Sequence, residues 1–499
     1  MAGLRRRFPP RKTSLADVLW TVFKAEQSNV SLLIAQLQLP DFEARDVRSA
    51  FRYDNGTFDI KELNLATTDG LMVRADGKIT GFDSKPDGAL NLSIDAPSAQ
   101  SVTNLSRLAG FDSVSPAARR RIDALAPFRL TGALEAVAKQ SILKLTLAGN
   151  AGGSELTFTG RLNGELDQLE TARVDVSGLI GNGDGHRLIA QLAPEVPLDK
   201  AGKDHGAGYL KVSALGALDA GLVSRIELRT PEASGQFEGQ IDGLGKPSWT
   251  FNGDLDLRAG HAATALSMLR ISPGGTPVTG PIDLKAKVSK SGAMYKVSGL
   301  SLNIGGEVIR GTVDVDASGE RAAAKIDIDA ETVFLPKVAA YLVDWDRQDL
   351  TSQIASIASG QGGIWPNEAF AMAALQSADG TLKLTARSIR VSDELTLSGG
   401  QLEASLQGGA LTVSKLEGRL YGGTIAVSGS LQALQGHVAL AAKVKADKLD
   451  LAELTGGLGG NTVAKGAAGF DLSLEGQGFS PRGLVSVLAG SGTLRLGGG

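Results

Sequence analysis

The chain has 499 residues, a formal net charge of -3 at pH 7 and no cysteine. One hydrophobic core usually stops growing at roughly 250 to 300 residues, so several domains or one repetitive body are expected. A slightly acidic chain has no electrostatic attraction to a phosphate backbone, which disfavours nucleic-acid binding. The lack of cysteine excludes disulfides, thiolate nucleophiles and cysteine-ligated metals.

The composition favours short antiparallel strands. Hydrophobic residues make up 42% of the chain but aromatic residues only 5%, so the apolar content is mainly aliphatic. The 64 glycines fall between short apolar runs, where they mark turns. No run of about 18 apolar residues predicts a membrane-spanning helix, and no apolar segment of an export signal follows the basic N-terminus.

The chain is expected to begin with helix. Residues 14–37 place Leu15, Val18, Leu19, Val22 and Phe23 on one helical stripe. We therefore predict an N-terminal helical segment over residues 1–50. Packing on the first strands is favoured over lying on a membrane surface, because acidic residues dilute the polar face.

Three further regions follow. Residues 51–345 are predicted to be a β-rich repeat region with helical interruptions, in which Asp69-Gly70 and Asp76-Gly77 are typical hairpin turns and a helix opens near Ser98. Residues 346–379 have little strand signal and form a predicted helical linker. Residues 380–499 are predicted to be a regular β-meander.

The clearest strand pair in that meander lies at residues 416–431, LEGRLYGGTIAVSGSL. Leu416 and Leu420 alternate with polar residues before the Gly422-Gly423 pair, and Ile425 and Val427 alternate after it. Such alternation places the apolar side chains on one face of a sheet. The sequence therefore predicts a one-sided hairpin turning at the two glycines.

The predicted strands outnumber the helices that might cover them. If about half of the chain is strand, there are on the order of thirty strands, against roughly eight predicted helices, each about 10 Å across. The apolar face must therefore meet another sheet, curl onto itself or stay open. We predict a mainly β fold with a few short helices, built on an elongated, curved antiparallel sheet with one apolar face, an open groove or half-barrel.

No motif predicts catalysis or metal binding. Neither GxSxG nor HExxH occurs, and the four histidines lie far apart in sequence. Acidic alternations such as Asp254/Asp256 are typical of a solvated strand face, and GNGDG at residues 181–185 lacks the tandem copies of a calcium-binding β-roll. We expect no catalytic, cofactor-binding or metal-binding residues and no enzyme activity.

Three segments carry a family resemblance: LTLSGGQLEASLQGGALTVS, LEGRLYGGTIAVSGSL and FDLSLEGQGFSPRGLVSVLAGSGTLRL. From about residue 382 to the end, their order resembles the AsmA-like family of Gram-negative cell-envelope proteins. The resemblance implies a long curved sheet in the periplasm with an apolar channel, a role in phospholipid movement and outer-membrane integrity, and an inner-membrane anchor. This sequence departs from the family pattern in having no such anchor segment, and we expect it to be a truncated version.

The residue pattern and the resemblance together predict a non-enzymatic protein of the periplasm, associated with the inner membrane. Its groove would carry or shield the acyl chains of a phospholipid or other envelope lipid between inner and outer membrane, supporting outer-membrane biogenesis. Further expected partners are inner-membrane and outer-membrane envelope proteins. The predicted lipid-groove residues are Leu402, Leu406, Leu411, Val413, Leu420, Ile425, Val427 and Leu440.

Two other interpretations remain open. Two sheets packed face to face would give a dry interior and a structural scaffold that assists outer-membrane protein assembly. An exported adhesin-like β protein is the third possibility, although no fixed-period repeat supports it.

Overall fold

The structure is a computed structural model. It describes residues 27–39, 42–81, 85–108, 122–164, 171–192, 206–217, 219–243, 248–262, 265, 280–334, 378–391, 395–434, 436–457 and 465–497.

Strands dominate these residues, which contain 24 strands. The strands of the first half are β1 (Gln27–Leu39), β2 (Phe42–Asp54), β3 (Thr57–Thr67), β4 (Met72–Thr80), β5 (Asp87–Ala96), β6 (Phe128–Val137), β7 (Ile142–Ala151), β8 (Ser154–Asn163), β9 (Arg173–Asn182), β10 (Gly208–Ala217), β11 (Gly221–Arg229), β12 (Ala233–Asp242) and β13 (Thr250–Ala259). The remaining strands are β14 (Ile282–Ser291), β15 (Met294–Ile304), β16 (Glu307–Asp316), β17 (Ala322–Phe334), β18 (Ala378–Arg390), β19 (Thr396–Gln407), β20 (Ala410–Leu420), β21 (Gly423–Ala433), β22 (Val438–Asp450), β23 (Ala467–Gly478) and β24 (Ala489–Gly497). The helices are α3 (Ala99–Leu108), the 3-10 turn η1 (Ala138–Gln140), α5 (Gly185–Leu192), α10 (Leu451–Gly457) and α11 (Pro481–Ser486).

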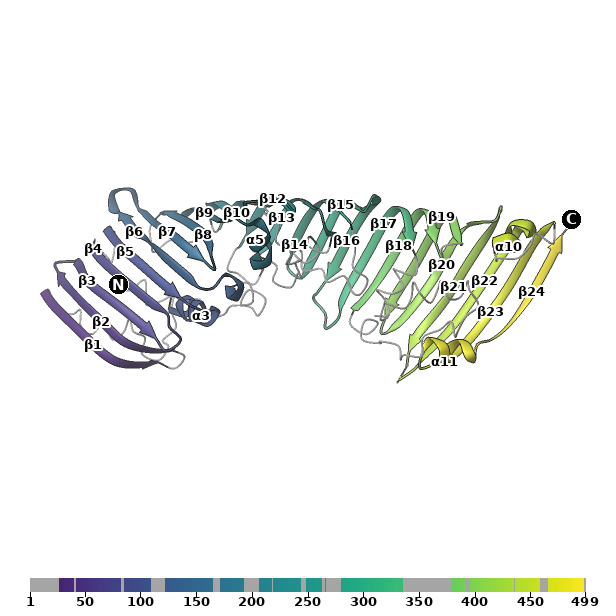
Figure 1. The fold of residues 1–499 in the computed structure, drawn as a ribbon, viewed down its shortest axis with the longest axis horizontal. Helices are drawn as coiled ribbons and strands as arrows, with labels where there is room; N and C mark the ends of the chain where they lie inside the picture. Colours follow the sequence, from purple (N-terminus) through teal and green to yellow (C-terminus); the bar gives the residue numbers. More distant parts are fainter. Residues whose placement is uncertain are drawn as a thin grey trace. The chain divides into compact units, whose positions relative to one another are not determined.

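The chain divides into two compact units, Met1–Gly253 and Asp254–Gly499. In the first unit, β1 to β12 pair in chain order, each antiparallel to the next (Figure 1). The described pairings do not join β1 to β12, so this meander is open.

The second unit is also an open meander. Strands β14 to β17 and β18 to β24 pair antiparallel in chain order. Strands β17 and β18 are the exception and run parallel. Parallel neighbours need a crossover of a dozen or more residues, and residues 335–377 supply that length between these two strands.

The prediction of a mainly β chain with a few short helices and an open antiparallel sheet is confirmed. The predicted helical segment over residues 1–50 is wrong where it can be checked, because β1 and β2 occupy Gln27–Leu39 and Phe42–Asp54. Val30, Leu32 and Ile34 alternate with polar or exposed positions, which is the period of a strand. The stripe at residues 15–23 lies outside the described residues, as does the predicted linker 346–379 except for its last two residues.

The hairpin turns partly follow the predicted glycine pairs. The turn at Asp69-Gly70 joins β3 to β4, but Asp76-Gly77 lies inside β4. Gly77 serves a close approach instead of a turn, since a Cβ there would stand 2.3 Å from the carbonyl oxygen of Ala89 on β5. The hairpin β20–β21 turns at Tyr421-Gly422, both with positive φ, and not at the predicted Gly422-Gly423 pair.

The largest buried core of the second unit lies over β17 to β22. Its members are aliphatic and 9% exposed or less: Ala330, Val333, Leu384, Ala386, Ile389, Leu397, Leu402, Leu416, Leu420, Ala446 and Leu449. At about 25 cal/mol per Å² of buried apolar surface, these side chains are a main source of stability for the unit.

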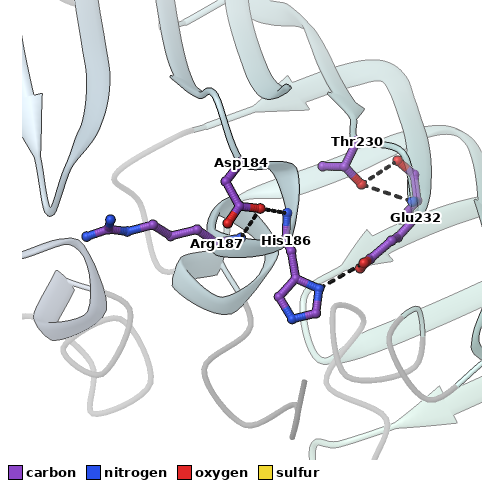
Figure 2. A network of polar contacts seen from close by, with 6 residues as sticks. Asp184, His186, Arg187, Thr230 and Glu232 are labelled. Atoms are coloured by element: carbon purple, nitrogen blue, oxygen red, sulfur yellow. Dashed lines mark hydrogen bonds and ion pairs between the residues drawn. The ribbon is translucent and has the colours of Figure 1, made fainter. Parts of the chain in front are cut away.

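In the first unit, helix α5 connects two separate turns of the sheet. Asp184 caps the helix by accepting hydrogen bonds from the backbone N–H of His186 (3.0 Å) and Arg187 (3.4 Å) (Figure 2). His186 Nδ1 lies 2.8 Å from Glu232 Oε1 in the β11–β12 turn, while Arg187 donates to the carbonyl of Gly152 in the β7–β8 turn (3.0 Å). The buried Leu188 packs with Ala151 and Ile180, so α5 covers one end of these strands.

None of the described helices is long and apolar enough to cross a membrane.

Candidate functional site

An aliphatic row crosses the second unit at right angles to its strands. Cross-strand partners follow one another from Ile328 on β17 through Leu384, Leu402, Leu416, Val427 and Val444 to Leu472 on β23. Partners directly opposite each other point to the same side of a sheet. These seven side chains therefore form a continuous apolar row on one side of the strands.

A bulge on β20 keeps this row in register. The pairing with β21 shifts between Val413 and Leu416, which sit three residues apart instead of the usual two. Ser414 and Lys415 lie between these two positions, so β20 has one residue more than β21 there. The extra residue places Leu416 on the same side of the strand as Val413. Strand β20 therefore presents Leu411, Val413, Leu416 and Leu420 on one side despite the break in sequence alternation.

The residues between these positions carry charge. Asp327, Lys383, Glu403 and Lys415 are successive cross-strand partners on β17 to β20 and alternate in sign. Lys415 also forms an ion pair with Glu417 (3.3 Å). All of these charged side chains lie on the side of the strands opposite the aliphatic row. The register thus separates aliphatic from charged side chains across these four strands.

The structure sorts the eight predicted groove residues into two sets. Five of them join the apolar cluster of the second unit: Leu402, Val413, Leu420, Ile425 and Val427. The other three lie outside that cluster in a neighbouring row, in which Leu406 is opposite Leu411, and Leu411 and Leu440 are both opposite Leu431.

Burial distinguishes the members further. Leu402 and Leu420 are only 5% and 7% exposed, whereas the other six predicted residues are half-buried. The central row members Leu384 and Leu416 are also buried, while Val427, Val444 and Leu472 are half-buried. Ile328 at the other end of the row is half-buried as well, so the row is accessible on β17 and on β21 to β23.

The first unit contains a comparable row. Successive partners from β5 to β12 are Leu92, Gly132, Leu147, Phe158, Gly178, Val212, Ile226 and Phe237. Val212 and Ile226 are 37% and 38% exposed, so this row is open to solvent at β10 and β11. Sequence reasoning missed it, although its period-2 alternation was visible in each strand.

The described residues contain no group of three or more histidine, aspartate or glutamate side chains arranged to hold a metal ion. His186 pairs with Glu232 at the end of a helix, and Asp254 and Asp256 form ion pairs with Lys287 (3.1 Å) and Lys285 (3.6 Å). Each of these groups has a structural partner.

The comparisons with known proteins concern the C-terminal part of the chain. Residues 351–499 match the model of the AsmA family. The predicted AsmA resemblance is confirmed for this region, which contains β18 to β24 and all eight predicted groove residues. No curated protein and no solved structure matches the chain.

Proposed function

We propose that this chain is a non-enzymatic cell-envelope protein that shields phospholipid acyl chains between the inner and outer membranes and so supports outer-membrane biogenesis. The observation that carries the proposal is the aliphatic row from Ile328 to Leu472 and its half-buried end at Val427, Val444 and Leu472. The AsmA match over residues 351–499 is consistent with an envelope role. The proposed location is the periplasm, next to the inner membrane.

The chemistry of the row suits an acyl chain. An acyl chain offers apolar area and no directional hydrogen-bonding group, so aliphatic side chains bind it without any polar partner. Six strand-to-strand steps of about 4.8 Å give the row a length of about 29 Å. Since the hydrocarbon core of a bilayer is about 30 Å thick, this length matches about two acyl chains end to end.

The buried and half-buried side chains of the row have different roles in this proposal. The buried Leu384, Leu402 and Leu416 support the fold, and the half-buried side chains of β21 to β23 contact the lipid. In this account Ile425, Val427 and Leu440 are contact residues, whereas Leu402 and Leu420 are core residues.

A structural scaffold for outer-membrane protein assembly is the competing function. The burial of Leu402 and Leu420 is what a closed, dry interior requires. Lipid analysis separates the two functions. The chain is expressed in the periplasm of a Gram-negative host, purified, extracted with organic solvent and examined by mass spectrometry. Phospholipid in near-stoichiometric amounts is expected, and a lipid-free protein would favour the scaffold.

A further inference from the structure

A cavity lies on β8 to β11 of the first unit, mainly on the side opposite the row from Leu92 to Phe237. Its volume is about 440 Å³, within the range of small-molecule sites of about 300 to 1,000 Å³. One cross-strand row, Thr157, Leu179, Lys211 and Glu227, runs through its lining. Ser177 and Tyr209 stand two residues from members of this row, so they face the same side.

The acceptor at one end of the cavity is fixed by two donors. The Tyr209 hydroxyl donates to Glu227 Oε1 at 2.9 Å, and Arg229 Nε lies 2.8 Å from the same oxygen. The hydrogen bond from Tyr209 lowers the pKa of the Glu227 carboxyl and raises the pKa of the Tyr209 phenol. Glu227 therefore presents its remaining carboxylate oxygen in one orientation as an ionised acceptor.

Donors line the rest of the cavity. The hydroxyls of Thr157, Thr159 and Ser177 form no hydrogen bond within the described part of the chain, and the ammonium group of Lys211 attracts the Glu227 carboxylate without a direct contact. Each hydroxyl can donate and accept, and the ammonium group offers three donors. Leu179, which is 43% exposed, adds an apolar surface between them.

This set of groups matches the chemistry of a sugar. A saccharide presents several hydroxyls that both donate and accept, together with an apolar C–H surface. A phosphate anion fits less well, because the Glu227 carboxylate lies in the lining and repels it. We propose that this cavity is a saccharide-binding site, with Lys211 and Glu227 fixing the orientation of a mono- or disaccharide. The site shares Phe158 and Gly178 with the row of the first unit, but its polar groups lie on the other side of the strands, and it does not depend on the lipid function proposed for the second unit.

Calorimetric titration of the full chain tests the site. The probes are glucose, maltose, N-acetylglucosamine and its β-1,4-linked disaccharide, with sodium phosphate as the anion control. At least one saccharide is expected to bind with a Kd on the order of 1 mM. Lys211→Met and Glu227→Gln should each weaken that binding tenfold or more.

The matched control is Glu238→Gln, which removes an exposed carboxylate from the ion pair with Arg225 on β11, outside the cavity lining. It should leave saccharide binding unchanged. Circular dichroism checks folding, and Ser177→Ala and Thr159→Val replace any cavity variant that does not fold. The proposal is overturned if none of the four saccharides binds, if phosphate alone binds, or if the control loses as much affinity as the cavity variants.

Discussion

Leu402 on β19 and Leu416 on β20 are cross-strand partners, and both side chains are almost completely buried, at 5% and 9% exposure. The next partner along the row, Val427 on β21, is half-buried. The change from buried to half-buried over one strand separates the part of the row that stabilises the fold from the part available to a ligand.

Truncating the buried part should destabilise the protein. Leu402→Ala removes a side chain from the apolar cluster and leaves a cavity, which typically costs 2 to 5 kcal/mol of unfolding free energy, by an order-of-magnitude estimate. Leu440→Ala, at a half-buried position outside that cluster, should cost clearly less. Urea unfolding followed by circular dichroism measures the unfolding free energy of both variants. Equal losses of unfolding free energy would contradict the assignment of Leu402 to the core and Leu440 to the accessible surface.

The half-buried part should be chemically accessible. Because the chain has no cysteine, single-cysteine variants report one position each. Val427→Cys should react with a maleimide reagent much faster than Leu402→Cys, and added phospholipid should slow Val427→Cys alone. Ser428→Cys, the next residue on the other side of β21, should react at a rate that lipid does not change. Lipid protection of Ser428→Cys would contradict the assignment of sides.

Gly423 at the start of β21 should not tolerate a side chain. A Cβ there would stand 2.3 Å from the carbonyl oxygen of Asp447 and 2.6 Å from that of Lys448, both backbone atoms of β22. Gly423→Ala should therefore cost about 1 to 3 kcal/mol of unfolding free energy. Gly422→Asn is the comparison, since Gly422 has φ +70° and open space around it, and asparagine adopts this backbone region readily. Thermal unfolding should show the larger loss for Gly423→Ala.

The pKa of Glu227 should depend on the Tyr209 hydroxyl. In Tyr209→Phe the main cause of the lowered pKa is gone, so the carboxyl should titrate at higher pH than in the wild type. A carboxyl whose pKa is lowered by folding stabilises the protein above its unfolded pKa and loses that effect as pH falls through the folded pKa. NMR titration of the Glu227 side chain measures the shift. Tyr295→Phe, which removes a tyrosine hydroxyl in the other unit, should leave the titration unchanged.

Much of the second unit could be predicted from sequence because apolar and polar residues alternate along most of its strands. The strands flanking the Leu416 hairpin and the apolar character of all eight groove residues follow from local pattern. The bulge at Ser414-Lys415, which aligns Leu416 with Val427, depends on pairing between strands and has no local signal.

Other features were not predicted correctly from the sequence, for identifiable reasons. Residues 27–39 contain apolar residues at both helical and strand spacings, and pairing with β2 decides for the strand. Asp76-Gly77 has the sequence of a turn, but Gly77 is needed where β4 approaches β5 closely. The cavity at Lys211 and Glu227 joins residues from four strands, and only the register brings them together.

The most direct test of the lipid function is the amount of phospholipid that co-purifies with adjacent charge variants of β21. Val427→Asp places a carboxylate in the accessible part of the row, and Ser428→Asp places the same group opposite Lys443 on the other side. Both variants should fold, as judged by circular dichroism. Val427→Asp should lose most of its bound phospholipid, and Ser428→Asp should retain the wild-type amount. Wild-type amounts of phospholipid on folded Val427→Asp would contradict the account.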